Sequence, residues 1–110
     1  MDRLKPITWL GTSRKDLRSF PGKVRQIFGV ELLALQLGYE PADWKPMTSL
    51  GQGVKEIRVQ SEGQYRVIYI AKFSDSIYVL HAFRKKSKRT SRQDIALARQ
   101  RLKKISGYYD

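Results

Sequence analysis

The sequence predicts an α+β fold: N-terminal helices packed on an antiparallel β-meander, followed by a basic C-terminal helix. Three observations indicate this order. Apolar residues between positions 22 and 37 recur every three or four residues, which is the period of a helix. Three segments rich in Val, Ile and Tyr, at about 54–60, 65–73 and 76–84, are separated by turn residues. The last segment, 91–105, has one narrow apolar seam among basic residues. A chain of 110 residues is expected to form one domain.

The first third of the chain is expected to contain a short strand and two helices. Ile7–Trp9 has the composition of a short edge strand. Thr12 or Ser13 can cap a short helix after it. A Pro-Gly pair then opens the longer helix, which we expect to continue to about Leu37 and to end at Gly38.

Residues 38–53 are expected to form a loop, with Trp44 and Met47 as its anchors. Four residues that break regular structure lie in it: Pro41, Pro46, Gly51 and Gly53. The final helix can begin at either of two capping boxes: Thr90 with Gln93, or Ser91 with Asp94.

The lengths of the two turns predict which side chains share a face of the meander. A three-residue loop at 61–63 is typical of a type I turn with its glycine in the left-handed conformation, and it places Arg58 opposite Arg66. A two-residue turn at 74–75 then places Arg66 opposite Phe83. One face therefore collects mainly polar residues: Glu56, Arg58, Arg66, His81, Phe83 and Lys85. The other face is apolar and is expected to pack on the long helix: Ile57, Val59, Tyr65, Val67, Tyr69, Leu80 and Ala82.

Two neighbouring arginines repel each other, whereas a bound phosphate would bridge them, and such a local conflict is expected at a functional site. Each signal also has a structural explanation. An arginine on a strand can pair with a carboxylate, and Glu56 could be that partner. His81 is the single histidine of the chain, and a lone histidine is more often a hydrogen-bonded structural residue than a catalyst.

Positive charge is concentrated near the C-terminus. The chain carries 22 Lys and Arg against 10 Asp and Glu, a net charge of +12. Residues 84–110 hold ten basic and two acidic residues, so they carry +8 of it. This concentration indicates a polyanionic partner, which could be RNA, DNA or an acidic protein. The basic run at 84–89 could also be no more than a solvated loop.

The composition excludes several kinds of chemistry. One His and no Cys leave no ligand set with metal-binding spacing, so no metal or other cofactor is expected. Nucleotide-binding loops and Ser-His-Asp signatures are absent from the sequence. RNA cleavage suits a basic site, because the 2′-OH of the substrate is the nucleophile and the protein orients it and neutralises the phosphate. The lack of cysteine and of an apolar leader favours a cytoplasmic protein, although a chain without cysteine would also be tolerated outside the cell.

Two motifs carry a resemblance to a known family. The segments Tyr-Arg-Val-Ile-Tyr at 65–69 and Leu-His-Ala-Phe-Arg-Lys-Lys-Ser at 80–87 resemble the phage-derived branch of the RelE/HigB toxins of type II toxin–antitoxin systems. The resemblance covers nearly the whole chain. It implies a RelE-like fold and a ribosome-dependent mRNA endoribonuclease that inhibits translation. It also implies a cognate helix-turn-helix antitoxin that neutralises the toxin and through which alone operator DNA would be bound; no membrane partner is implied.

The resemblance also implies roles for individual residues. Arg66 matches the family arginine that stabilises the scissile phosphate, and Arg58 matches a basic residue on the preceding strand. There are two departures: Glu56 stands where the family has a lysine, and Tyr108 and Tyr109 do not align with the C-terminal tyrosine of RelE. The candidate catalytic residues are Arg58, Arg66, Lys85, Lys86 and, as general acid or base, His81. The candidate RNA-binding residues are Lys55, Phe83, Arg84, Lys88 and Arg89.

Two other classes of function fit parts of the sequence. The same basic surface could bind ribosomal RNA or an acidic antitoxin without cleaving RNA, in which case no new mRNA 5′ ends would form. The basic final helix could enter a DNA groove, but it lacks the Asn- and Gln-rich edge that favours base contacts.

Overall fold

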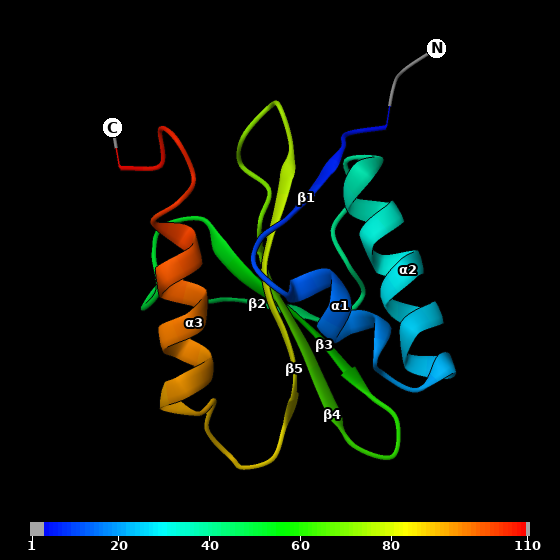
Figure 1. Cartoon of the computed structure of the whole chain (residues 1–110). Helices are drawn as coiled ribbons and strands as arrows, with labels where there is room; N and C mark the ends of the chain where they lie inside the picture. Colours follow the sequence, from blue (N-terminus) through cyan, green and yellow to red (C-terminus); the bar gives the residue numbers. More distant parts are fainter. Residues whose placement is uncertain (1–3, 110) are drawn as a thin grey trace.

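The computed structural model describes residues 4–109, in which helices cover both faces of a five-stranded sheet (Figure 1). The strands are β1 (Ile7–Trp9), β2 (Trp44–Pro46), β3 (Val54–Gln60), β4 (Gln64–Ile70) and β5 (Ile77–Lys85). The helices are α1 (Ser13–Arg18), α2 (Gly22–Gln36) and α3 (Arg92–Leu102). The predicted α+β fold, with helices first and a basic helix last, is confirmed.

The sheet is wider than the predicted meander. Its strand order is β1-β5-β4-β3-β2, with β1 parallel to β5 and the other neighbours antiparallel. The edge strand at Ile7–Trp9 is confirmed. The loop predicted at 38–53 contains β2, so that prediction was wrong there. A strand of three residues that ends at Pro46 is too short to show an alternating pattern, and proline is tolerated at a sheet edge.

The β3–β4 hairpin has the predicted register, with Arg58 opposite Arg66 and Gln60 opposite Gln64. Its turn differs in one detail. The residue in the left-handed conformation is Glu62, with φ 51°, while Gly63 has φ 153°. The three-residue loop length therefore set the register correctly, although the conformation inside the loop was predicted incorrectly.

The β4–β5 hairpin follows the prediction only at one end. Arg66 lies opposite Phe83 as predicted, but the strands are joined by residues 71–76 and not by a two-residue turn. A β-bulge after Ile68 absorbs the difference by shifting the register. The bulge turns Leu80 to the side of α3, so its predicted place against the long helix was wrong.

Each face of the sheet has its own hydrophobic core. The apolar side of α2 packs on one face, mainly through Val24, Phe28, Leu32 and Leu35. Part of the other face is covered by α3 through Ala98 and Leu102, and a polar cluster occupies another part of it. None of the helices within residues 4–109 has the length and hydrophobicity that a membrane span requires.

Arg101 anchors α3 on the rest of the fold and is buried, although it is one of the basic residues around the apolar seam of the predicted final helix. Its guanidinium donates from Nη1 to the carbonyl oxygen of Leu80 at 3.0 Å, and from Nη2 to Oγ1 of Thr12 at 3.2 Å. The chain passes so close at Gly11, where φ is +55°, that a Cβ there would overlap the guanidinium. A buried polar anchor of this kind joins α3, β5 and the loop before α1.

Candidate functional site

A cluster of charged side chains lies on the sheet face that carries α3. Glu56 and Arg58 point to this face from β3, and Arg66 joins them because it lies directly opposite Arg58. Lys45 of β2 lies opposite Glu56. The strand register therefore brings three of the predicted polar residues together and adds a lysine that the sequence reasoning missed.

Glu56 is fully buried at the centre of this cluster. Its Oε1 lies 3.5 Å from Nε of Arg66 and 3.9 Å from Nζ of Lys45. Neither carboxylate oxygen has a hydrogen-bond partner within the described chain. Burial raises the pKa of Glu56 above its ordinary value of 4.5, and the cations around it, Lys45 first, lower that pKa in part.

The raised pKa of Glu56 predicts how stability depends on pH. The folded state binds this proton more tightly than the unfolded state, so the contribution to stability is complete below pH 4.5 and is lost as pH rises through the folded pKa. Glu56→Gln cannot ionise. We therefore expect the free energy of unfolding of wild type, relative to this variant, to fall as pH rises above 4.5. Urea unfolding of both proteins between pH 4 and 8, about the range of carboxylate titration, measures this; parallel pH profiles would contradict it.

Arg66 is held rigidly beside Glu56 and is only 7% exposed. Its Nη1 donates to the carbonyl oxygen of Tyr65 at 3.0 Å, and its Nη2 donates to Oε1 of Gln64 at 3.2 Å. A guanidinium has about five N–H groups. With Nε directed at Glu56, one N–H on each Nη is left for a ligand.

Arg58 is partly exposed and has its own acidic partner. It donates to Oδ1 of Asp43 from Nε at 3.1 Å and from Nη2 at 2.8 Å. The repulsion expected between Arg58 and Arg66 is thus relieved by two separate carboxylates. An open pocket of about 250 Å³ lies over this pair and is lined by Asp43, Arg58, Gln60, Gln64 and Arg66.

His81 is buried and both its ring nitrogens are engaged. Nε2 lies 2.7 Å from Oδ1 of Asp94, and Nδ1 lies 3.2 Å from Nη1 of Arg101. Because an arginine can only donate, Nδ1 accepts and the ring proton is on Nε2. The ring also stacks on Phe83, with 5.0 Å between centroids, and Phe83 is itself buried. This environment is that of a structural histidine joining β5 to α3.

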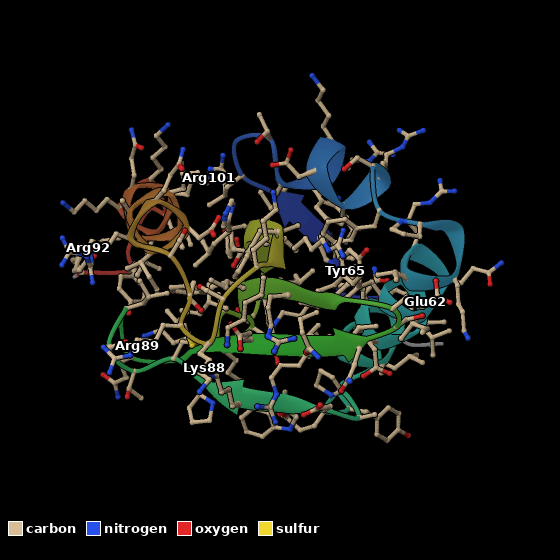
Figure 2. All side chains as sticks on the ribbon, turned by 90° about the horizontal axis from the view of Figure 1, so that it is seen from below. Glu62, Tyr65, Lys88, Arg89, Arg92 and Arg101 are labelled. Atoms are coloured by element: carbon tan, nitrogen blue, oxygen red, sulfur yellow. The ribbon has the colours of Figure 1, made fainter. Side chains whose placement is uncertain are left out.

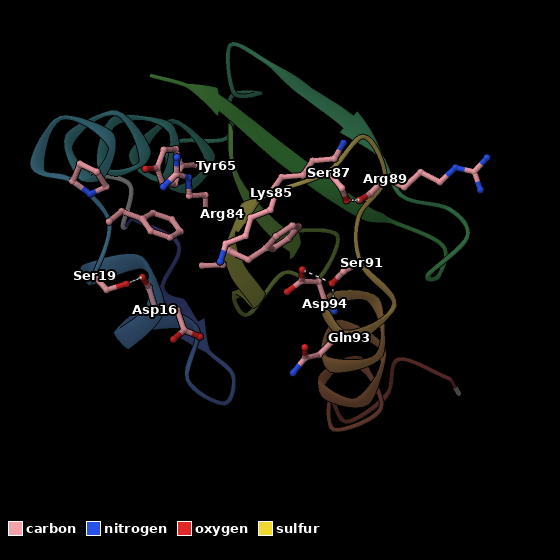
Figure 3. A pocket seen from close by; sticks show the side chains of 15 residues that line it. Asp16, Ser19, Tyr65, Arg84, Lys85, Ser87, Arg89, Ser91, Gln93 and Asp94 are labelled. Carbon is pink, nitrogen blue, oxygen red and sulfur yellow. Dashed lines mark hydrogen bonds between the residues drawn. The ribbon is translucent and has the colours of Figure 1, made fainter. Parts of the chain in front are cut away.

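A larger pocket, of about 710 Å³, lies between α1 and the start of α3 and is lined in part by Lys85 and Lys86 (Figure 3). Asp16 and Ser19 border it from the end of α1, and Gln93 and Asp94 border it from α3. Burial is the main cause that lowers the pKa of Lys85, and the nearby charge of Arg66 adds to it. Lys85 therefore releases a proton more readily than an ordinary surface lysine.

Only some of the candidate RNA-binding residues share a site: Phe83, Arg84 and Arg89 line the larger pocket with Lys85 and Lys86, whereas Lys55 and Lys88 do not. Lys55 points to the opposite face of the sheet, where it pairs with Glu40 and lies over the ring of Trp44. Arg84 lies over the ring of Tyr65. Arg89 lies at the border of the larger pocket, and its side chain extends outward there in Figure 3. In Figure 2, Lys88, Arg89 and Arg92 gather at the end of the molecule opposite Glu62. Lys88 and Arg89 are exposed.

Lys45 and Asp43 are the members of the charged cluster that the sequence did not reveal. Both lie in the region predicted as a loop, and Lys45 is flanked by Trp44 and Pro46. The sequence offered one signal for Lys45: it stands between Trp44 and Pro46, two residues that suit the edge strand of a sheet. That signal is too weak to identify a binding site.

Comparison with known families gives a match over most of the chain. The family model described as "Phage derived protein Gp49-like (DUF891)" matches residues 15–103, which include the whole charged cluster and the whole of α3. No curated protein matches the chain. The chain belongs to the phage-derived Gp49-like family.

Proposed function

We propose that the protein is the toxin of a type II toxin–antitoxin system and that it is a metal-independent endoribonuclease acting on mRNA at the ribosome. Its family belongs to the toxin–antitoxin-like RelE/HigB-type group. The observation that carries the nuclease assignment is the buried, oriented guanidinium of Arg66. It borders an open pocket with N–H groups left for an anion and has Arg58 beside it.

The proposed reaction uses the 2′-OH of RNA as nucleophile. The 2′-oxygen bonds to phosphorus and its proton leaves to solvent. The bond from phosphorus to the 5′-oxygen breaks, which gives a 2′,3′-cyclic phosphate and a 5′-hydroxyl. Arg66, with Arg58 beside it, stabilises the charge on the phosphate. Lys85 donates the proton to the leaving 5′-oxygen and is reprotonated by solvent.

Lys85 is a better proton donor in this scheme than His81. Lys85 lines the larger pocket, where a leaving oxygen could reach it, and burial lowers its pKa from the ordinary value of a lysine. His81 is enclosed by Asp94, Arg101 and Phe83, so we assign it to holding α3 on the sheet. Lys86, Lys88 and Arg89 would contact neighbouring phosphates of mRNA.

The proposed partners are mRNA on the ribosome and a helix-turn-helix antitoxin, with operator DNA bound through the antitoxin, all in the cytoplasm. A net charge of +12 supports an acidic or nucleic-acid partner. A second candidate is a module that binds RNA without cutting it. One contact favours it. The hydroxyl of Tyr108 donates to the carbonyl oxygen of Gln52, so Tyr108 is engaged away from the charged cluster and does not take the place of the C-terminal tyrosine of RelE.

Induced expression tests the proposed function. We expect wild type to arrest growth and to create new mRNA 5′ ends, mapped by primer extension. The control is the same gene with a stop codon at Trp9. Arrest without new 5′ ends would favour the binding module, and growth equal to that of the control would overturn the toxin assignment.

A further inference from the structure

We propose that Lys45, Arg66 and Lys85 form one phosphate-binding cluster, in which Lys45 contacts RNA and Glu56 is a positioning residue that holds the cations in place. The proposal rests on the proposed function and names two members of its site that neither the sequence resemblance nor the family match assigns. The three cations and one carboxylate leave a net charge of +2, while Arg58 is balanced by Asp43.

The contacts of Glu56 indicate that its role is to position these cations. A buried ion pair is weak support for stability, because desolvation offsets the attraction. Here both oxygens of Glu56 and Nε of Arg66 are buried without hydrogen-bond partners among residues 4–109. Nε of Arg66 lies 3.5 Å from Oε1 of Glu56, which is longer than the roughly 2.7–2.9 Å of a charge-assisted hydrogen bond. Such incomplete pairing is expected where a site and not a core is being built.

Lys45 has the geometry of a residue that contacts the ligand. It reaches Glu56 from β2 at 3.9 Å, which is too long for a hydrogen bond and leaves its three N–H donors for an anion. Its side chain is 43% exposed, whereas that of Arg66 is 8% exposed. Lys45 and Arg66 approach the same oxygen, Oε1 of Glu56, so their charged groups lie near each other. One phosphate that contacts Nζ of Lys45 and the outer N–H groups of Arg66 would therefore bridge them.

Lys85 joins the cluster from β5, because Phe83 lies opposite Arg66 and Lys85, two residues later on the same strand, is on the same face of the sheet. The charges that act on it are those of Arg66, Glu56, Lys45 and Arg58, the same groups that act with it on Glu56. The cluster thus draws one residue from each of four strands. The strands fix the backbone positions of these residues, and the carboxylate of Glu56 attracts the side chains of Lys45 and Arg66 toward one point. The cations are therefore already arranged before RNA binds.

Binding of an uncleavable RNA tests the role of Lys45. The probe is a fluorescent single-stranded oligonucleotide with 2′-O-methyl riboses, and the readout is anisotropy at several salt concentrations. Lys45→Ala is expected to weaken binding about fivefold and to lower the salt slope by about 1. Lys23→Ala is the matched control, because Lys23 is exposed on α2 across the sheet, and it should behave like wild type. Equal binding by the two variants would overturn the role of Lys45, and so would a wild type that does not bind.

The role of Glu56 is tested by Glu56→Gln, which keeps the shape of the side chain and removes its charge. We expect its RNA binding to be at least as tight as that of wild type, and its cleavage to fall about tenfold because Nε of Arg66 loses the carboxylate that aligns it. Glu56→Asp should restore part of the cleavage. Weaker binding by Glu56→Gln, or unchanged cleavage, would overturn the positioning role.

RNA binding measured as a function of pH tests the role of Glu56 without relying on cleavage. Protonation of Glu56 removes a charge that opposes phosphate, so wild type should bind the 2′-O-methyl RNA more tightly as pH falls, and Glu56→Gln should lack that increment. The groups that face Glu56 from β2, β3, β4 and β5 are Lys45, Arg58, Arg66 and Lys85. Identical pH profiles would overturn the inference. A wild type that shows the increment but cuts no RNA would overturn the proposed nuclease and leave the phosphate cluster standing.

Discussion

Arg66→Ala is expected to abolish RNA cleavage, lowering its rate by at least about 10²-fold, and with it the growth arrest. Arg66 is the one cation of the cluster that is both buried and oriented by two hydrogen bonds to its guanidinium. Fixed donors aimed at developing charge contribute more than mobile surface lysines, because they need no reorganisation in the transition state. New mRNA 5′ ends after induction, counted against wild type at equal protein level, measure the effect.

The alanine variant also leaves the carboxylate of Glu56 buried without its nearest cation, which costs about 3–5 kcal/mol of folding stability. Two further variants separate catalysis from folding. Arg66→Lys keeps a charge beside Glu56 but loses the planar fork, so it should fold and cleave at least about tenfold more slowly. Arg99→Ala removes an exposed arginine from α3 and should stay fully active. Equal cleavage by Arg66→Lys and wild type would contradict the role of Arg66.

The sequence predicted what depends on local rules. The β3–β4 register followed from the length of one loop, and it placed Arg58 beside Arg66. The period of two along β3 placed Glu56 on the same face. These predictions succeeded because strand geometry converts short-range sequence spacing directly into position.

The rest depends on contacts between distant segments. Lys45 joins the cluster through β2, a strand of three residues stabilised mainly by its pairing with β3. The partners of His81 come from α3, and no spacing rule places a helix on a sheet. The bulge after Ile68, which turned Leu80 to the other core, likewise reflects packing and not local propensity. The sequence therefore identified the central arginines and Glu56, and the structure was needed to find Asp43 and Lys45 beside them.

Arg101→Ala is expected to lower the free energy of unfolding by about 3 kcal/mol. The variant loses hydrogen bonds to the carbonyl oxygen of Leu80 and to Thr12, and it leaves Nδ1 of His81 without a donor. Hydrogen bonds from a charged donor contribute about 1.5–3 kcal/mol each, and buried acceptors left unpaired add a desolvation cost. The space that the side chain vacates beside Gly11 is an added loss.

Urea unfolding of the purified variants measures this loss, with Arg99→Ala as the matched control two residues earlier on α3. Arg99 is exposed, so its removal should change stability by less than about 0.5 kcal/mol. Arg101→Lys should recover little, because an ammonium cannot reproduce the planar fork that reaches Leu80 and Thr12 together. Removing His81 as well should cost less than the sum of the single changes, because the two side chains share one hydrogen bond. If Arg101→Ala were as stable as Arg99→Ala, the apolar residues of α3 alone would hold the helix on the sheet. The structural role assigned to His81 would then be wrong, and His81 would again be the candidate for proton transfer.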